Sequence, residues 1–331
     1  MKITIARLRS GTNYKTPLHD IMDSFYELYK EYMKKHPEHT YGVCNFGWNA
    51  MNRKTLDDIV DADVILIPSE NEFFQHINGY VHTKQKARSD EFVASIAEHL
   101  KNKHVVILRS DRADNEELYR TRVFKGAEIG KFSTFDEMDI PGGLHGMKYH
   151  FIKENLPVNL FGEVTKQYDF IYWGCDKRKL IDNVDSGDTR HLILRDIKNH
   201  PRISTYFIGK YNAIVPDKKI DSMYNLLPLL QEARSTLCFN WLDPVATTSR
   251  YHEAIACGIL PFVWDTYDSY NTLVATSWQR VKSVEELLLK LEDVEKMFPI
   301  IEKHYIENTM KPKEWYYEKF EQRLDEIING V

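Results

Sequence analysis

Short apolar runs alternate with helical patterns along the chain, and this alternation constrains the fold more than any other feature. Eight runs have the length and period of strands, in two groups: residues 2–6, 41–46, 63–68 and 104–109, then 169–173, 202–209, 235–240 and 260–265. Helical patterns lie between them at residues 17–35, 84–101, 189–199, 222–233 and 283–295. Strand–helix alternation is typical of parallel sheets with helical crossovers. The sequence therefore predicts an α/β protein with two Rossmann-like domains rather than one barrel.

The size and composition of the chain agree with this prediction. A chain of 331 residues with 43% apolar and 28% charged residues is long enough for two domains with ordinary cores. It contains no apolar run of membrane-spanning length, and the N-terminal apolar stretch is too short for a signal peptide, so we read that stretch as the first strand. We therefore expect no membrane association. We also expect a monomer in the cytoplasm.

Cysteine usage and net charge limit the classes of site. Cys44, Cys175, Cys238 and Cys257 are scattered and form no CxxC motif, which argues against structural zinc and favours a reducing compartment. The thirteen histidines show no HxxxH or HExxH spacing. A net charge of −5 argues against nucleic-acid binding over the whole surface, but it leaves room for a local basic cleft.

The most informative motif is TTSRYHEAIACG at residues 247–258, which lies between two apolar runs. It predicts a polar loop, a short helix and a glycine that joins two strands. Thr247, Thr248 and Ser249 are candidate caps for the helix. The amino end of a helix attracts phosphate, and Arg250 adds a fixed cation there. Glu253 follows on the same helical face, so the motif suits the phosphate and the sugar diol of a nucleotide sugar. The alternative is a surface salt bridge between Arg250 and Glu253.

A basic cluster follows the fifth predicted strand. In YWGCDKRK a strand ends at Gly174, and Lys177 and Arg178 follow within a few residues, with Arg190 and Arg195 further on. Arginine offers a bidentate fork and lysine a point charge, so this cluster could clamp a diphosphate. A solvated basic face is the alternative.

Two acidic residues follow strands of the first half. Asp111 in ILRSDRAD comes just after a predicted strand, where a carboxylate could act as a general base toward a substrate hydroxyl. Asp20 opens the first predicted helix, after a loop that contains Gly11. For both aspartates the alternative is a helix N-cap without a role in chemistry.

Two further segments bear on domain organisation. Residues 132–164 are rich in proline and glycine and break the alternation, so we read them as the irregular end of the first domain running into a linker. Residues 313–328 form an amphipathic helical pattern.

In this order, the motifs resemble those of the DNA β-glucosyltransferases of T-even bacteriophages, which are two-domain enzymes of the GT-B fold. The resemblance rests on NYKT with Pro17 and Asp20, VILIPSENEFF at residues 64–74, ILRSDR, FIYWGCDKR and SRYHEAIACG. The basic residues near the domain entry are more spread out than in that family. The resemblance implies two facing Rossmann-like domains with a deep cleft. Residues 1–165 would bind acceptor and DNA, residues 166–311 would bind a nucleotide sugar, and the helix at 312–331 would pack back on the first domain.

The resemblance also implies roles for individual residues. Asp111 would be the general base of an inverting transfer, and Asp20 is a second catalytic candidate. The donor-binding residues would be Gly174, Lys177, Arg178, Arg190, Ser249, Arg250 and Glu253. The acceptor-binding residues would be Ser69, Asn71, Phe73, Phe74 and Arg112. The donor would be a UDP-sugar, and Mg²⁺ or Mn²⁺ could assist the leaving group, although no carboxylate pair reads as its ligand.

The implied partner is double-stranded DNA that carries a modified base of the 5-hydroxymethylcytosine type. Candidate phosphate contacts are Lys101, Lys103, Arg112, Arg120, Arg122, Lys125, Lys148 and Lys210. Two alternatives stay open. One is a GT-B enzyme that uses a UDP- or GDP-sugar on a saccharide, lipid or protein. The other is a binding or redox Rossmann protein, against which the absence of G-x-G-x-x-G after the first strand argues.

Overall fold

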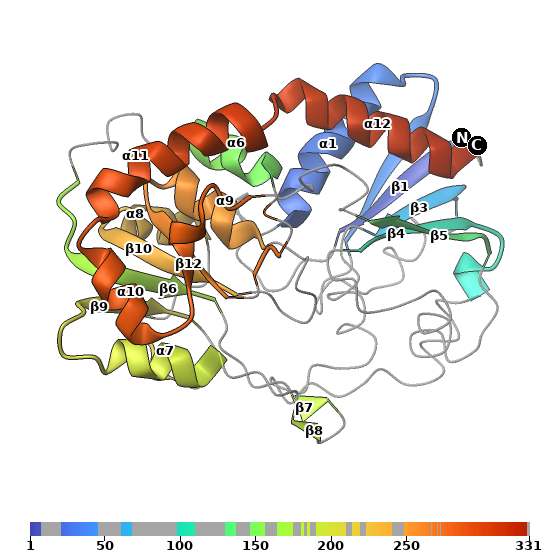
Figure 1. Cartoon of the computed structure of the whole chain (residues 1–331). Helices are drawn as coiled ribbons and strands as arrows, with labels where there is room; N and C mark the ends of the chain where they lie inside the picture. Colours follow the sequence, from blue (N-terminus) through green and yellow to red (C-terminus); the bar gives the residue numbers. More distant parts are fainter. Residues whose placement is uncertain are drawn as a thin grey trace. The chain divides into compact units, whose positions relative to one another are not determined.

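The structure is a computed structural model. It describes residues 1–7, 21–45, 61–67, 98–109, 130–136, 146–155, 164–174, 180–181, 184–185, 190–209, 214–218, 223–239, 248–265, 267–269, 271 and 273–329. The chain divides into two compact units, and each contains a sheet (Figure 1). The first unit comprises Met1–Lys15, Met22–Leu144 and Pro312–Val331. The second comprises Thr16–Ile21 and His145–Lys311.

The first unit is built on a five-stranded parallel sheet. Its strands are β1 (Lys2–Arg7), β2 (Thr40–Asn45), β3 (Val64–Ile67), β4 (His104–Arg109) and β5 (Phe132–Asp136), in the order β2-β1-β3-β4-β5. The three inner strands, β1, β3 and β4, bury Val, Ile and Leu side chains because a parallel sheet is covered on both faces.

Among the described elements, helices α1 (Ile21–Lys35) and α12 (Lys313–Asn329) pack on this sheet. Helix α1 places the buried Tyr29 so that its hydroxyl donates to the carbonyl oxygen of Ile3 at 3.0 Å. Helix α12 buries Phe320 against Phe135 of β5, with ring centroids 5.5 Å apart. The hydroxyl of Tyr32 donates to Asp325 at 2.7 Å and ties α12 to α1. The C-terminal helix is therefore part of the first unit.

The second unit is built on a second five-stranded parallel sheet. Its strands are β6 (Tyr168–Trp173), β9 (Thr205–Ile208), β10 (Ala233–Cys238), β11 (Leu260–Trp264) and β12 (Arg280–Val281), in the order β12-β11-β10-β6-β9. Its helices are α6 (Gly146–Asn155), α7 (Arg190–Lys198), α8 (Met223–Leu230), α9 (Ser249–Ala256), α10 (Val284–Leu291) and α11 (Val294–His304). A 3₁₀ turn (Ser277–Gln279), a π-helical turn (Tyr305–Thr309) and a hairpin of β7 (Leu180–Ile181) and β8 (Val184–Asp185) complete the described elements.

Both sheets have the same winding. Counted in chain order within its own sheet, each has the strand order 2-1-3-4-5. The winding reverses between the first and third strands, at β1/β3 in one sheet and at β6/β10 in the other. Open parallel sheets bind ligands at the carboxyl ends of the strands beside such a switch point. The fold thus directs attention to the ends of β6 and β10.

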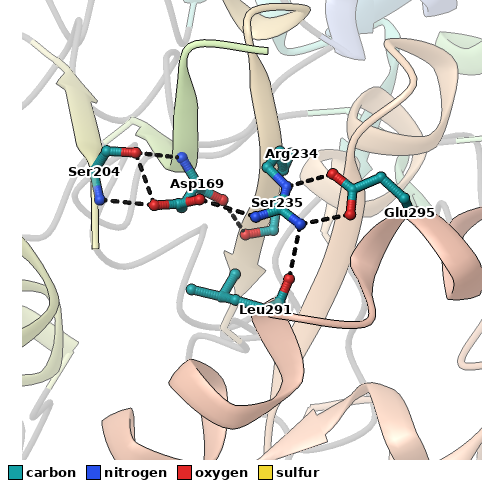
Figure 2. Close-up of polar contacts among 6 residues, drawn as sticks. All are labelled: Asp169, Ser204, Arg234, Ser235, Leu291 and Glu295. Atoms are coloured by element: carbon teal, nitrogen blue, oxygen red, sulfur yellow. Dashed lines mark hydrogen bonds and ion pairs between the residues drawn. The ribbon is translucent and has the colours of Figure 1, made fainter. Parts of the chain in front are cut away.

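The amino ends of the same strands carry a closed polar network, shown in Figure 2. Arg234, near the start of β10, donates through Nε and Nη2 to the two carboxylate oxygens of Glu295 at 2.6 and 2.5 Å. Its Nη1 donates to Asp169 at 3.0 Å, and Nη2 also donates to the carbonyl oxygen of Leu291 at 3.0 Å. The other carboxylate oxygen of Asp169 accepts from the amide and the hydroxyl of Ser204 at 2.9 and 2.8 Å. This network joins three strands to the helices that cover them.

The structure confirms the predicted α/β class with two parallel sheets, and it corrects the segment at residues 132–164. All eight predicted strands are present, but each sheet has a fifth strand. The segment expected to be irregular contributes strand β5 to the first sheet and helix α6 to the second unit. The boundary expected at residue 165 therefore falls too late, because α6 packs against α9 of the second unit. The helix predicted at 283–295 is present as α10 but ends earlier, at Leu291, and a further helix, α11, that was not predicted begins at Val294.

No described helix is both long and apolar enough to cross a lipid bilayer. Cys238 and Cys257 are buried free thiols, and burial raises the pKa of Cys238 to about 12.

Candidate functional site

Helix α9 begins as the motif predicted, but it is capped differently. Thr248 stands at the N-cap with extended backbone angles (φ −120°, ψ 152°), and its side chain makes no capping hydrogen bond. Its amide instead donates to the hydroxyl of the buried Tyr267 at 2.9 Å. Thr247 lies outside the described residues. The Thr248 side chain therefore leaves the first-turn amides of α9 without the partner that an N-cap usually supplies.

Arg250, in the first turn of α9, points its guanidinium back at the end of β6. Its Nη2 donates to the carbonyl oxygen of Trp173 at 2.5 Å. The guanidinium lies 4.4 Å from the ring centre of Tyr172 and 5.5 Å from that of Trp173. Its buried Nε has no hydrogen-bond partner, and it forms no ion pair with any carboxylate of the described residues. A permanent cation with an unsatisfied donor therefore lies at the switch point.

Gly174 allows this approach. It follows β6 with φ of 111°, a conformation that residues with a side chain rarely adopt. A Cβ atom at this position would lie 2.7 Å from Nη2 of Arg250. A side chain at position 174 would strain the backbone and displace the guanidinium of Arg250, so both observations favour glycine here.

Glu253, one turn further along α9, does not pair with Arg250. It is 3% exposed, and its Oε1 lies 2.9 Å from the ammonium of Lys148 on α6. Its Oε2 accepts from the indole nitrogen of Trp173 at 2.7 Å, and the hydroxyl of Ser249 also donates to it. Burial alone would raise the pKa of Glu253, but Lys148 and these hydrogen bonds outweigh it and lower the pKa to about 2. The carboxylate is ionised and held from three directions.

Trp173 joins the two halves of the motif. Its carbonyl oxygen holds Arg250, while its indole nitrogen holds Glu253. Trp173 ends the predicted strand, but aromatic residues in strands usually belong to the core, so the sequence pattern does not mark it as a site residue. The surface salt bridge considered for Arg250 and Glu253 is therefore wrong, because each has a different partner.

Arg190 supplies a second cation at the same end of the sheet. It begins α7, is 7% exposed, and lies 5.4 Å from the ring centre of Phe239, which follows β10. The ring of Phe239 lies 6.4 Å from that of Tyr172, on which Arg250 rests. Two guanidinium groups thus flank a pair of aromatic rings at the carboxyl ends of β6 and β10.

Several predicted residues lie outside the described part of the chain and stay predictions. They are Asp20, Ser69, Asn71, Phe73, Phe74, Asp111, Arg112, Lys177 and Arg178, and the candidate phosphate contacts Arg120, Arg122, Lys125 and Lys210. Among the described residues, Arg195 lies exposed on α7 with its Nε 3.5 Å from Asp196, as expected of a solvated face. His252 is buried, and its Nδ1 lies 2.6 Å from the hydroxyl of Tyr305, so it packs in the interior.

Two lysines expected to contact DNA phosphates are engaged elsewhere. Lys148 is buried against Glu253, so the expectation that it meets DNA is wrong. Lys103 donates to the carbonyl oxygen of Ala62 at 2.7 Å, and partial burial lowers its pKa. Lys101 is exposed. The role of Lys148 had no local signal in the sequence, because its partner lies more than a hundred residues away.

The arrangement favours an anion bound beside a hydroxyl-bearing group. A cation with an unsatisfied donor and the positive end of a helix attract a phosphate. An ionised carboxylate one turn away can accept from a hydroxyl. Within the described ranges, no three His, Cys, Asp or Glu side chains come together as a metal site.

No protein-family model matches this chain, and no curated protein sequence matches it. Solved structures do. The DNA-modifying enzyme β-glucosyltransferase, studied with and without uridine diphosphoglucose, matches with a TM-score of 0.62 at 13% identity, over 99% of this chain and 100% of that one. T4 phage β-glucosyltransferase in complex with UDP and Mn²⁺ matches with a TM-score of 0.62 at 14% identity, over 98% of this chain and 100% of that one. The T4 phage enzyme in complex with UDP-glucose matches with a TM-score of 0.60 at 15% identity, again over 98% of this chain and 100% of that one. At such identities the likeness establishes the fold, which is the GT-B fold that the sequence resemblance implied.

Proposed function

We propose that this protein transfers a sugar from a UDP-sugar to the hydroxyl of a modified base, of the 5-hydroxymethylcytosine type, in duplex DNA. The observation that carries the proposal is the unsatisfied guanidinium of Arg250 at the β6/β10 switch point. It is supported by a fold that matches T4 phage β-glucosyltransferase over nearly the whole of both chains.

The donor would bind through its diphosphate and its ribose. Arg250, Arg190 and the first amides of α9 would hold the diphosphate, and Lys177 or Arg178 would add to them. An ionised carboxylate has about four acceptor positions, and Lys148, Trp173 and Ser249 occupy three of those of Glu253. One ribose hydroxyl could take the remaining position without displacing a protein donor.

The reaction would be a single in-line displacement. A bond forms between the acceptor oxygen and the anomeric carbon, while the bond from that carbon to the diphosphate oxygen breaks, and UDP leaves with the electron pair. Asp111 accepts the proton of the acceptor hydroxyl, and the anomeric configuration inverts. General-base catalysis is typically worth about 10²–10⁴-fold. Arg250 and the helix amides stabilise the charge that develops on the diphosphate, and such preorganised donors usually contribute more than the base. Asp20 is the second carboxylate candidate on the acceptor side.

A divalent cation would supply further neutralisation of the leaving diphosphate. One solved relative contains UDP and Mn²⁺. The residues that the structure describes do not provide a ligand set for such an ion, so no step is assigned to it.

The acceptor would be reached by flipping the nucleotide out of the duplex, because the hydroxymethyl group lies in the major groove beside the base stack. Flipping costs a few kcal/mol, by order of magnitude. Ser69, Asn71, Phe73, Phe74 and Arg112 would contact the flipped nucleotide. Lysine and arginine contacts to phosphates would make DNA affinity fall steeply with salt, so salt-independent binding would count against a DNA acceptor.

Mass spectrometry of DNA tests the proposal. Hydroxymethylated and unmodified duplexes are incubated with the protein and a panel of UDP- and GDP-sugars, and free saccharides serve as competing acceptors. We expect one hexose or pentose per modified base, from a UDP-sugar, and no product with Asp111→Asn. Transfer only to saccharides would agree with the proposed donor site but contradict a DNA acceptor. An undiminished rate in Asp111→Asn would show that Asp111 is not the general base.

A further inference from the structure

Helix α6 brings a buried ammonium to the candidate donor site. Lys148 is 6% exposed, yet its ammonium lies 2.9 Å from Oε1 of Glu253, which is itself 3% exposed. Its neighbours on α6, Met147 and Tyr149, are also buried. The helix packs against α9 (Figure 1), so the ion pair joins two helices inside the second unit.

Folding alone does not explain a charged pair at this place. Moving two charges out of water is costly, and apolar residues of similar volume frequently replace buried ion pairs with no loss of stability. The pair lies one helical turn from Arg250, the residue that the proposed function assigns to the diphosphate. A role in ligand binding would explain why a buried ion pair, rather than apolar residues, occupies this place.

Charge explains why a lysine is needed there. A bare carboxylate at Glu253 would repel a diphosphate held by Arg250, since both would be anions in an interior of low dielectric constant. An ammonium 2.9 Å from the carboxylate cancels most of that repulsion while leaving the carboxylate able to accept a hydrogen bond. Trp173 fixes the other oxygen at 2.7 Å, so the orientation of the carboxylate is set as well.

We propose that Lys148 is a positioning residue of the donor site, which neutralises and orients Glu253 so that the carboxylate and a diphosphate can occupy neighbouring positions. The inference rests on the proposed function and adds to it a residue from a segment that precedes the second sheet. It predicts that the charges at positions 148 and 253 tune affinity for the diphosphate, and that affinity for the nucleoside changes much less.

The test is a charge series read by calorimetric titration at one pH and one salt concentration. UDP and uridine are titrated into the wild type, Lys148→Met, Glu253→Gln and the double variant. The ratio of UDP affinity to uridine affinity measures how much the diphosphate contributes to binding. We expect this ratio to fall at least about tenfold in Lys148→Met, to rise in Glu253→Gln, and to return near the wild-type value in the double variant.

Lys153→Met is the matched control. Lys153 lies on the same helix, half-buried, with its ammonium 4.0 Å from a different carboxylate, that of Glu302. We expect its ratio to equal that of the wild type. If Lys148→Met does not fold, Glu253→Gln and the double variant still test the inference, because the double variant contains no unpaired buried charge.

The outcomes separate the two proposals. A purely structural lysine would lower the unfolding temperature of Lys148→Met and leave the ratio of UDP to uridine affinity unchanged across the series, which would overturn the inference. A wild-type protein that binds neither UDP nor any nucleotide sugar would overturn the proposed function, and the inference with it.

Discussion

Two arginines at opposite ends of the second sheet show how the same residue type serves different purposes. Arg234, at the amino ends, directs its donors to two carboxylates and a carbonyl oxygen (Figure 2). Arg250, at the carboxyl ends, donates to the carbonyl oxygen of Trp173, forms a side-chain hydrogen bond with Tyr172 and lies against two aromatic rings, and its Nε has no hydrogen-bond partner. An arginine whose three nitrogens all donate to protein acceptors joins elements of the fold, whereas an arginine with a nitrogen that lacks a partner retains a donor for a ligand. The comparison predicts that the two can be separated by mutation.

The largest effect should follow removal of Arg250. In Arg250→Met the diphosphate loses a fixed partner, and we expect kcat/KM for sugar transfer to fall about 10²–10³-fold, as when one preorganised donor is removed from a transition state. Unfolding by urea should change little, because no carboxylate among the described residues loses a partner. Steady-state kinetics with UDP-glucose and hydroxymethylated DNA measure the first effect. A variant that loses stability but keeps its kcat/KM would reverse the two roles.

The next effect concerns pH and the carboxylate beside Arg250. The pKa of Glu253 is lowered from 4.5 to about 2 in the folded protein, so ionised Glu253 stabilises the fold above pH 4.5, and this contribution is lost as pH falls toward 2. The loss amounts to about 3 kcal/mol, by order of magnitude. We expect the free energy of unfolding, measured by urea titration across this range, to fall less steeply with decreasing pH in Glu253→Gln than in the wild type. Parallel curves would show that Glu253 is not held as the structure indicates.

Removal of Arg234 should lower stability and leave UDP affinity unchanged, which is the opposite of the pattern expected for Arg250→Met. Arg234→Met leaves Asp169 and Glu295 without their cation, and we expect a loss of about 2 kcal/mol in the free energy of unfolding. UDP affinity should not change. Lys303→Met, which removes an exposed pair with Glu307 at 3.9 Å, is the control and should cost less than about 0.5 kcal/mol. An Arg234 variant that binds UDP much more weakly would contradict the separation of the two ends.

The smallest effect is expected from Gly174→Ala, which tests whether the close approach of Gly174 positions Arg250. Gly174→Ala forces a side chain into a backbone with φ of 111° and places a Cβ 2.7 Å from Nη2 of Arg250. We expect a loss of about 1–2 kcal/mol in stability. Because the guanidinium must move, UDP affinity should also fall, by less than in Arg250→Met. Equal UDP affinity in Gly174→Ala and the wild type would show that the contact does not position Arg250.

Local patterns predicted much of this fold, and the reason is visible in particular elements. Strands such as β3 and β11 are continuous apolar runs because parallel strands are buried on both faces. The helix from Ser249 to Ala256 was predicted from its polar start and the glycine beyond its end. Helix α6 was missed because Gly146, Met147, Lys148 and Tyr149 are buried in succession, which erases the one-sided apolar period of a surface helix.

The candidate site was predicted only in part, for a related reason. Arg250, Glu253 and Gly174 lie in short motifs whose spacing carries chemical meaning. Their partners come from distant segments: Lys148 from α6 and Trp173 from β6. Nothing in a local pattern indicates a contact between residues so far apart in sequence, since tertiary packing decides it.

The role of Arg250 in holding the diphosphate is measured by calorimetric titration of UDP into the wild type, Arg250→Met and Arg234→Met. We expect the wild type and Arg234→Met to bind UDP with the same affinity and Arg250→Met to bind it at least about tenfold more weakly. Equal affinity of the wild type and Arg250→Met would contradict this role, because the cation at the carboxyl ends of the strands would then have no part in holding the diphosphate.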